Sequence, residues 1–511
     1  MPKIKFDINQ PVRAESSVVS NWLKENGGRY WKAVRSLAKR HDPESKRILD
    51  KMRLEGDSLA DATVIKLFDE GPKEANAASR LMLYLFQYGA LPRQAQEGSG
   101  PASTPSFRDA PDSGRASASG PVAGRISQDF TEEEVVKRLT EKLENDVYKG
   151  AAEILLPYLK ESAKLPPWYN EELIKQGEKV FEEHGIVAFS VLGCASLPTG
   201  YAVPLAAKVL GFTQQLEEHA KRRLAETVIF LIDVMVPDPV FGVPGGLHPN
   251  GNGIHTIQRV RLMHAAIRHL LTSSPRAANG TGKPENLPHA FLRYSWNKDK
   301  DGIPLNQVLM SATILCFSYI ALRSLRQLGV RLSQEEQRGY LHCWNVAGYV
   351  IGVKDELLLP RPESMEAAKE KFSQIWEEYR GRKPTPDTVK LAKTLLEFLG
   401  EPLSGLGYFK HAPKTLMRAL VGRQVTDVLG VKFSLGEELL ALLVLPILRW
   451  VDYLERKFVG VRKASFGLLQ RMIVQIEREE RGGDRPPFRI PTRLKEMGCR
   501  VQTGVRAQLN W

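Results

Sequence analysis

The feature that most constrains this chain is the stretch at residues 254–271, IHTIQRVRLMHAAIRHLL. In a helix, each residue is rotated by about 100° from the one before. That rotation predicts one stripe made of four apolar side chains and one imidazole: Ile257, Val260, His264, Ile267 and Leu271. Arg261 and Arg268, three residues before and four after the histidine, fall along one edge of the stripe. The pattern therefore places an imidazole inside an apolar face, with two cations pointing the same way.

Two interpretations of His264 follow. A lone histidine on an apolar face is more often a satisfied core residue than a ligand. The arginines favour a ligand, because guanidinium groups beside a buried stripe need anionic partners. Haem, which is flat and apolar with a central iron and carboxylates on one rim, would fit this face, with its propionates contacting Arg261 and Arg268. Ordinary ion pairs with Asp or Glu elsewhere in the fold are the alternative.

The composition is that of a globular protein with more than one folding unit. The chain has 511 residues, whereas single cores usually stop growing at roughly 250 to 300 residues. Its net charge is +13, but Lys and Arg are spread along the chain and mixed with acidic residues, so we expect no nucleic-acid partner. A helical scaffold that binds nucleic acid or acidic lipids is a weaker alternative.

Cysteine usage and apolar runs indicate the cellular compartment. The cysteines stand alone with no CxxC pair, which argues against a zinc site or a disulfide-stapled fold: Cys194, Cys316, Cys343 and Cys499. The first ten residues lack the apolar run of a signal peptide. Apolar stretches at 308–322 and 439–451 fall short of the roughly 20 residues that span a bilayer. We therefore expect a cytoplasmic protein without a transmembrane segment.

Three regions are predicted along the chain. Residues 1–93 are helical and polar, which indicates a small N-terminal accessory region. Residues 94–127 are rich in Gly, Pro, Ser and Ala, the composition of a disordered linker. From residue 128 to 511 helical periodicity dominates and strand-like alternation is scarce, so an all-α domain is expected.

Several catalytic motifs are absent from the sequence. There is no HExxH, no ExxH pair and no GxSxG elbow. The Gly-rich stretch at 242–253 follows a predicted helix rather than a strand, and 278–284 resembles a phosphate loop only at its GK. Hydrolase, phosphate-loop and dinucleotide chemistry are therefore not predicted.

A second helix is predicted at residues 219–236, HAKRRLAETVIFLIDVMV, and it places Arg223, Thr227, Phe230 and Val234 on one face. Beside bound dioxygen, a hydroxyl and a guanidinium would stabilise the negative charge that develops on the outer oxygen. Alternatively, Thr227 bonds back to the carbonyl of Arg223, and Arg223 extends to solvent.

A third helix is predicted at residues 342–359, HCWNVAGYVIGVKDELLL, with Trp344, Gly348 and Gly352 at intervals of four. A glycine face lets a partner approach the backbone closely. We expect this partner to be a neighbouring helix rather than a porphyrin. A nonhaem metal site built from His248, His255 and His264 is disfavoured, because His255 points about 180° away from His264 on the same helix.

Five segments, in this order along the chain, resemble the latex-clearing-protein and MpaB-like oxygenase family: SLPTGY at 196–201, RRLAET at 222–227, RVRLMHAAIRH at 259–269, GIPLNQ at 302–307 and WNVAGYVIGV at 344–353. The resemblance covers about residues 165–435 and leaves the first 130 residues outside. The block around His264 is its most specific part.

The resemblance implies a globin-like helical core that holds one b-type haem, with His264 as the proximal iron ligand and Arg261 and Arg268 near the propionates. Arg223 and Thr227 match the family's residues on the distal side. Characterised members split carbon–carbon double bonds of isoprenoids with dioxygen. The expected partners are therefore an apolar substrate and dioxygen, together with an electron donor if the reaction needs one.

Two departures from the family pattern concern the reaction. Latex-clearing proteins have a lysine just before the distal threonine, and this chain has Glu226 there. Their catalytic glutamate should fall near residues 205–208, where this chain has LAAK and no carboxylate. Glu226 is the nearest carboxylate on the predicted distal helix and is our candidate base. A haem-binding or gas-binding protein without catalysis is the alternative.

Overall fold

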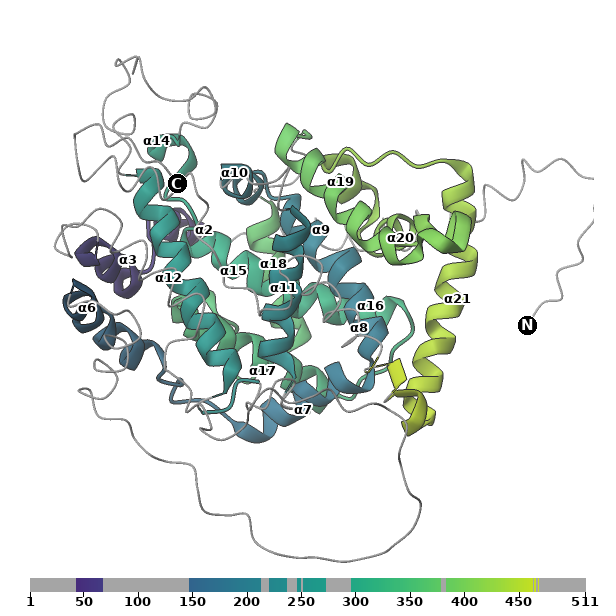
Figure 1. The fold of residues 1–511 in the computed structure, drawn as a ribbon, viewed down its shortest axis with the longest axis horizontal. Helices are drawn as coiled ribbons and strands as arrows, with labels where there is room; N and C mark the ends of the chain where they lie inside the picture. The colour runs from purple at the N-terminus through teal and green to yellow at the C-terminus, as the bar shows by residue number, and fades with distance from the viewer. Residues whose placement is uncertain are drawn as a thin grey trace, which may run out of the picture.

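The computed structural model describes residues 43–67, 147–212, 220–236, 246–249, 251–272, 296–377, 383–462, 464, 465 and 467. Within these ranges the chain forms helices and no strand (Figure 1). The predicted all-α fold class is therefore confirmed. The predicted linker at 94–127 and most of the predicted accessory region lie outside the described residues.

The α-helices are α2 (Pro43–Met52), α3 (Ser58–Ile65), α6 (Val147–Ser162), α7 (Glu171–Glu183), α8 (Gly185–Val191), α9 (Leu197–Tyr201), α10 (Pro204–Phe212), α11 (Ala220–Met235), α12 (Asn252–Thr272), α14 (Lys298–Asp301), α15 (Gln307–Leu315), α16 (Ala321–Gln327), α17 (Gln334–Val350), α18 (Met365–Glu377), α19 (Pro386–Gly400), α20 (Ala412–Val428) and α21 (Leu435–Lys457). Two π-helical segments are η2 (Leu192–Ser196) and η3 (Cys316–Ile320). Two 3₁₀ segments are η4 (Asp355–Leu357) and η5 (Glu401–His411).

Polar side chains fix where several helices begin. Asn170 and Asn306 cap α7 and α15 by accepting the backbone N–H of the third residue after the cap. Ser333 and Ser434 begin α17 and α21 with capping boxes, in which the serine and a following glutamate satisfy each other's backbone N–H groups. These boundaries therefore follow from local sequence alone.

Two of the three predicted helices are confirmed, and the third is too long. The helix predicted at 254–271 is α12, and the one predicted at 219–236 is α11. The helix predicted at 342–359 ends with α17 at Val350, because Gly352 adopts φ +93° just beyond it. Gly348 and Gly352 therefore do not form one helical face. The Cβ of an alanine at Gly348 would lie 2.8 Å from the Leu358 side chain, so this glycine packs against protein.

The described helices share one hydrophobic core. Its largest fully buried side chain is Trp344 of α17, whose ring stacks on Phe317 of η3 with centroids 5.2 Å apart. Helices α7, α8, α11, α12 and α15 to α20 all contribute to the same cluster of buried apolar residues. The cavity described below is therefore surrounded by packed helices.

The described part of the predicted accessory region, residues 43–67, belongs to this core. Met52 is buried in it, and the backbone carbonyl of Glu55 accepts a hydrogen bond from the backbone N–H of Gln307 at 3.0 Å. The Gln307 side chain also donates to the carbonyl of Gly56 at 2.8 Å. These contacts join residues about 250 positions apart, and no local pattern in the sequence indicates them.

Few helices of the described chain are long and apolar enough to span a membrane. The run Gln307–Gln327 is long and apolar enough, and 89% of its most apolar window is buried inside the protein. Glu171–Glu183 and Gly185–Tyr201 would qualify only as a pair, and they meet at 94°. Both candidates belong to the helical core, where buried helices have the same composition as a span.

The end of α17 yields a stability prediction. In Gly352→Ala, the new Cβ would lie 2.4 Å from a carboxylate oxygen of Asp57, at a backbone φ of +93°. We expect the free energy of unfolding to fall by about 3 kcal/mol, from backbone strain and displacement of that carboxylate together. Chemical denaturation followed by circular dichroism measures the change.

Gly407→Ala is the matched control. Gly407 has φ +61°, but nothing lies within 4 Å of the place that an alanine Cβ would occupy, so this variant carries backbone strain alone. It should lose about 1 kcal/mol. Equal losses in the two variants would show that contact with Asp57 does not constrain residue 352.

Candidate functional site

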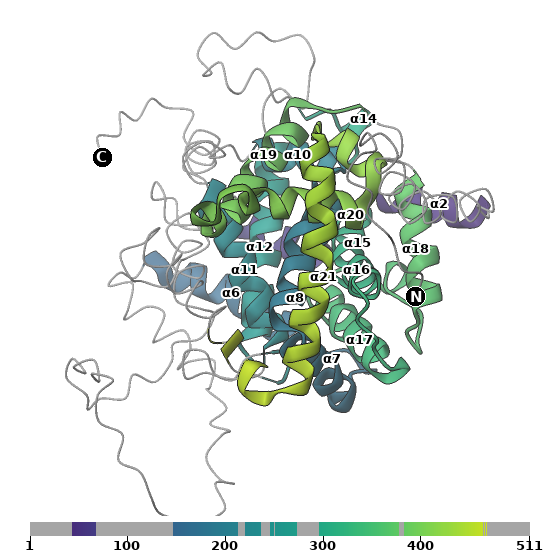
Figure 2. The ribbon, with the colours of Figure 1, turned by 90° about the vertical axis from the view of Figure 1, so that its right-hand side faces the viewer.

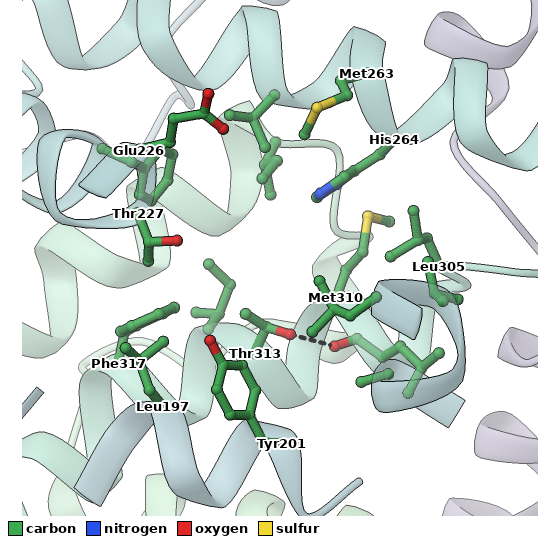
Figure 3. A pocket seen from close by; sticks show the side chains of 18 of the residues that line it. Leu197, Tyr201, Glu226, Thr227, Met263, His264, Leu305, Met310, Thr313 and Phe317 are labelled. Carbon is green, nitrogen blue, oxygen red and sulfur yellow. Dashed lines mark hydrogen bonds between the residues drawn. The ribbon is translucent and has the colours of Figure 1, made fainter. Parts of the chain in front are cut away.

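An apolar cavity of about 280 Å³ lies within the helical core (Figure 3). Side chains from α9 to α12, α15, α17 and α19 line it. Most are Leu, Ile, Val, Met or aromatic, and the polar lining residues are few: Tyr201, Glu226, Thr227, His264, Thr313 and Thr394. Mostly apolar walls with a small number of polar groups are typical of a small-molecule site.

His264 enters this cavity from α12. Figure 3 shows its imidazole pointing into the cavity between Met263 and Met310. Val260 and Ile267, which share the predicted stripe, also line the cavity. The other two stripe residues, Ile257 and Leu271, are buried in the protein without lining it. The predicted apolar face is thus divided between the cavity and the surrounding packing.

Glu226 and Thr227 enter the same cavity from α11. Glu226 is buried, and the hydroxyl of Thr227 points into the cavity from the side opposite His264 (Figure 3). Phe230 of the same predicted face also lines the cavity. Arg223 lies on α11, but its side chain is outside the described part of the structure. The structure therefore brings Glu226 and Thr227 together with His264, and their roles stay predictions.

Helix α10 supplies an apolar wall where the family's glutamate was expected. Ala206, Val209 and Leu210 face the cavity. Lys208 is absent from the lining, and its ammonium group pairs with Asp301 at 2.5 Å. Among the described lining residues, Glu226 is therefore the one carboxylate.

Both π-helical segments adjoin the cavity. The segment η3 carries Phe317, and η2 leads directly into α9, which carries Leu197 and Tyr201. The two segments also contact each other. A π-helical turn holds one residue more than an α-helical one and is often found at functional sites. No pattern in the sequence indicated either segment.

Arg261 pairs with α3 rather than reaching the cavity. Its guanidinium donates to both carboxylate oxygens of Asp57, at 2.5 and 2.9 Å, and to the carbonyl of Val350 at 2.9 Å. This two-point contact is the strongest geometry for an arginine and a carboxylate. Asp57 also begins α3 by accepting the backbone N–H of Ala60. The Asp57 side chain therefore joins the start of α3 to the middle of α12.

Arg268 makes the second contact between the same helices. Its Nε donates to Asp61 at 2.7 Å, and its Nη1 donates to the carbonyl of Leu305 at 3.0 Å. Neither Arg268 nor Arg261 is among the residues that line the cavity. The structure thus contains the ion pairs that were the alternative to propionate contacts, and the geometry gives the propionate roles no support.

The two ion pairs differ electrostatically. Burial lowers the pKa of Arg261, but the hydrogen bonds and charge of Asp57 outweigh it, and the pKa is raised overall. For Asp61, burial dominates over the nearby Arg268, so the pKa of this carboxyl is raised above its usual value. A raised carboxyl pKa means that folding disfavours its charged form. The Asp57–Arg261 pair has two hydrogen bonds between its side chains and the Asp61–Arg268 pair has one, so the first pair is the stronger.

The other histidines of the rejected three-histidine site have partners elsewhere. His248 contacts Glu178 at 3.1 Å, and His255 contacts the Gln258 side chain at 3.3 Å. Within the described ranges, no group of three or more His, Cys, Asp or Glu side chains could hold a metal ion. Of the three histidines, His264 is the one that lines the cavity.

Several residues of this region were missed by sequence reasoning. Asp57 and Asp61 lie four apart, which places them on one face of α3, but nothing local indicates that they face two arginines of α12. Tyr201 was inside the SLPTGY segment and could have been proposed from it. Thr313 had no signal, and its hydroxyl donates to the carbonyl of Leu309 within α15.

Comparisons with known proteins agree on one group of relatives. Residues 181–450 match the family model described as ER-bound oxygenase mpaB/B'/Rubber oxygenase, catalytic domain. A rubber oxygenase from Streptomyces sp. (strain K30) is 24% identical over 278 residues, or 54% of this chain and 60% of that protein. A solved structure of Latex Clearing Protein LCP in the closed state has a TM-score of 0.53 at 19% identity, covering 83% of this chain and 90% of that chain.

The matched region contains the cavity but not the acidic residues that pair with α12. The chain covers about 60% of the length of the curated relative, and the structural likeness at this identity concerns the fold. His264, Glu226 and Thr227 all lie within residues 181–450, whereas α2 and α3 lie before that range. Asp57 and Asp61 therefore lie outside the residues that match the family model.

The ion pairs between α3 and α12 yield a prediction. Asp57→Asn keeps the size and the helix cap but removes the charge opposite Arg261, whose side chain is 11% exposed. We expect the free energy of unfolding to fall by about 3 kcal/mol, because a buried cation is left without its carboxylate. Urea denaturation measures the loss.

Asp61→Asn is the comparison variant. The Asp61 side chain is 29% exposed, so solvent screens its pair with Arg268, and the expected loss is about 1 kcal/mol. A larger loss for Asp61→Asn than for Asp57→Asn would reverse the ranking of the two ion pairs.

Proposed function

We propose that this chain, which belongs to the ER-bound oxygenase mpaB/B' and rubber oxygenase catalytic-domain family, is a haem b-dependent oxygenase for an apolar substrate. The observation that carries the proposal is the placement of His264, Glu226 and Thr227 on one apolar cavity, although they come from two different helices. A metal ligand, a candidate base and a hydrogen-bond donor are the groups that such chemistry needs.

His264 would hold the haem iron through its imidazole. The fit rests on the one imidazole that lines a mostly apolar cavity in the described structure. When bound, the haem would supply the iron that activates dioxygen. The Asp57–Arg261 and Asp61–Arg268 pairs would act as positioning contacts, because they fix the helix that carries His264.

Thr227 and Glu226 would act on the other side of the cavity. The Thr227 hydroxyl would donate a hydrogen bond to an oxygen atom that gains negative charge. A Glu226 carboxylate oxygen would accept an allylic proton from the substrate. We keep Arg223 as a proposed second donor on the same helix. Apolar side chains around these groups would exclude water and hold a hydrocarbon chain.

The apolar lining favours a hydrocarbon substrate such as an isoprenoid. Oxidative cleavage of its carbon–carbon double bond would give aldehyde and ketone ends. The described cysteines Cys194, Cys316 and Cys343 are buried and free, which supports a reducing compartment, and we propose the cytoplasm. An electron donor would be needed only if the iron must first be reduced.

One observation favours a second candidate function. The α10 wall is apolar where the relatives' catalytic glutamate was expected, so a haem-binding or gas-binding protein without turnover would explain it. That protein would bind haem through His264 and form no product with any terpenoid under any reductant.

Substituting His264 tests the haem ligand. The purified wild-type protein should show a Soret band, and His264→Ala should lose it or shift it, because the iron loses its protein ligand. Ultraviolet–visible spectroscopy of equal protein concentrations measures the change. His255→Ala is the matched control, since His255 lies on the same helix outside the cavity lining and should leave the band unchanged. An unaltered Soret band in His264→Ala would exclude His264 as the axial ligand.

Substituting Glu226 tests the candidate base. Glu226→Gln keeps the shape of the side chain but cannot accept a proton, so turnover of a terpenoid panel with dioxygen should fall at least about 100-fold. Product formation measured by mass spectrometry gives the change, and the Soret band should match that of the wild type. Full activity in Glu226→Gln would exclude Glu226 as the base. Haem binding without product in the wild type would favour the second candidate function.

A further inference from the structure

Helix α21 exposes an apolar face to solvent. It lies across one side of the protein, outside the other labelled helices (Figure 2). Its exposed large side chains are mainly apolar: Leu439, Leu442, Leu443, Ile447, Trp450 and Tyr453. Trp450 is 63% exposed and Leu443 is 55% exposed, which is unusual for side chains of this size when they lie together.

Three of the four carboxylates of α21 are buried, and Glu438 in its first turn is partly exposed. Asp452 is buried and contacts Nδ1 of His184 at 2.5 Å, and Glu437 accepts a hydrogen bond from Lys414 at 2.6 Å. Glu455 is also buried. The helix is thus already packed on α20 and α8 through one face that includes these acids. The apolar outer face therefore lies opposite the face that packs on α20 and α8.

Cations surround the outer face. Arg449, Arg456 and Lys457 are exposed, whereas no carboxylate is exposed between Leu439 and Val459, a span described in full. Arg456 pairs with the buried Asp452 at 3.1 Å, and Arg449 donates to the carbonyl of Leu328 at 2.9 Å. The Lys457 ammonium group lies 5.4 Å from the ring centre of Tyr453 and 5.5 Å from that of Phe458. Leu, Trp and Phe on one face with Arg and Lys beside them are typical of helices that lie in a membrane interface.

The apolar surface continues onto η5. Tyr408 is half exposed, and its hydroxyl would lie 2.5 Å from a Cβ placed at Gly436, so it lies against the first turn of α21. Leu406 and Phe409 of η5 are exposed as well. We call these three residues, together with the outer face of α21, the docking face. The segment η5 packs on α19, which lends Leu391 and Thr394 to the cavity.

We propose that the docking face binds the surface of a membrane that contains anionic lipid. Its apolar side chains would enter the interfacial region, while Lys457 would contact the phosphate and carboxylate headgroups. The charge favours this partner, because a face with cations and no exposed carboxylate complements an anionic surface. The inner face of α21 is packed on protein, so the helix lies on the membrane and does not cross it.

Co-sedimentation of the full chain with vesicles tests the proposal. Vesicles of equal parts phosphatidylcholine and phosphatidylserine should bind the protein, and vesicles of phosphatidylcholine alone should bind it less. Raising the salt concentration should weaken binding to the anionic vesicles, because it screens the headgroup charge. Binding is measured without turnover, so the result is independent of haem and of the proposed reaction.

Two variants separate the apolar and the charged contributions. Ile447→Gln combined with Trp450→Gln should reduce binding to anionic vesicles at least about tenfold. Lys457→Glu should reduce it at least about fivefold and remove the preference for phosphatidylserine. Leu54→Gln is the matched control, since Leu54 is 63% exposed but lies outside the docking face, and it should bind as the wild type does. Circular dichroism should be unchanged in all variants.

Three outcomes would overturn the proposal. The first is no binding of the wild type to anionic vesicles, and the second is equal binding of wild type and the Ile447/Trp450 double variant. The third is a dimer, measured by light scattering, that the double variant dissociates while vesicle binding is absent. That last result would assign the face to contacts between copies of this chain.

Discussion

The buried contact between Arg261 and Asp57 determines how the rest of this protein is arranged around its cavity. It joins the start of α3 to the middle of α12, one turn from His264. Val350, at the end of α17, contributes its carbonyl to the same guanidinium. Three helices from distant parts of the chain therefore meet at one cation. Burial removes water from both charges, which costs free energy. The attraction between Arg261 and Asp57 offsets that cost only while the surrounding groups hold both side chains in this geometry.

The cavity combines two properties that normally oppose each other. Apolar walls exclude water and suit a hydrocarbon, but they also make any polar group costly to hold there. Glu226, Thr227 and His264 are nevertheless directed into it from α11 and α12. The proposed binding and proton transfer would use these three groups together. The positioning contacts of Arg261 and Arg268 run along one edge of the α12 stripe that carries His264, and neither arginine lines the cavity.

Local patterns predicted the parts of the fold that depend on local physics. The period of α11 and α12 and the stripe that carries His264 could be read directly, because amphipathic spacing is a property of each helix alone. The partners of Arg261 and Arg268 could not be read, since Asp57 and Asp61 lie about 200 residues away. The end of α17 was missed because Gly352 was interpreted as part of a packing face, whereas its positive φ terminates the helix. The family resemblance supplied the order of segments, and spacing alone did not rank His264 above a structural histidine.

The two π-helical segments place irregular backbone beside the cavity. In a π turn the backbone hydrogen bond reaches five residues rather than four, so η2 and η3 each hold an extra residue at the cost of regular bonding. The two segments contact each other, and Phe317 of η3 and Leu197, which follows η2, line the cavity. The cavity is therefore bounded by irregular helix on this side and by the regular helix α12 on the side that Asp57 contacts.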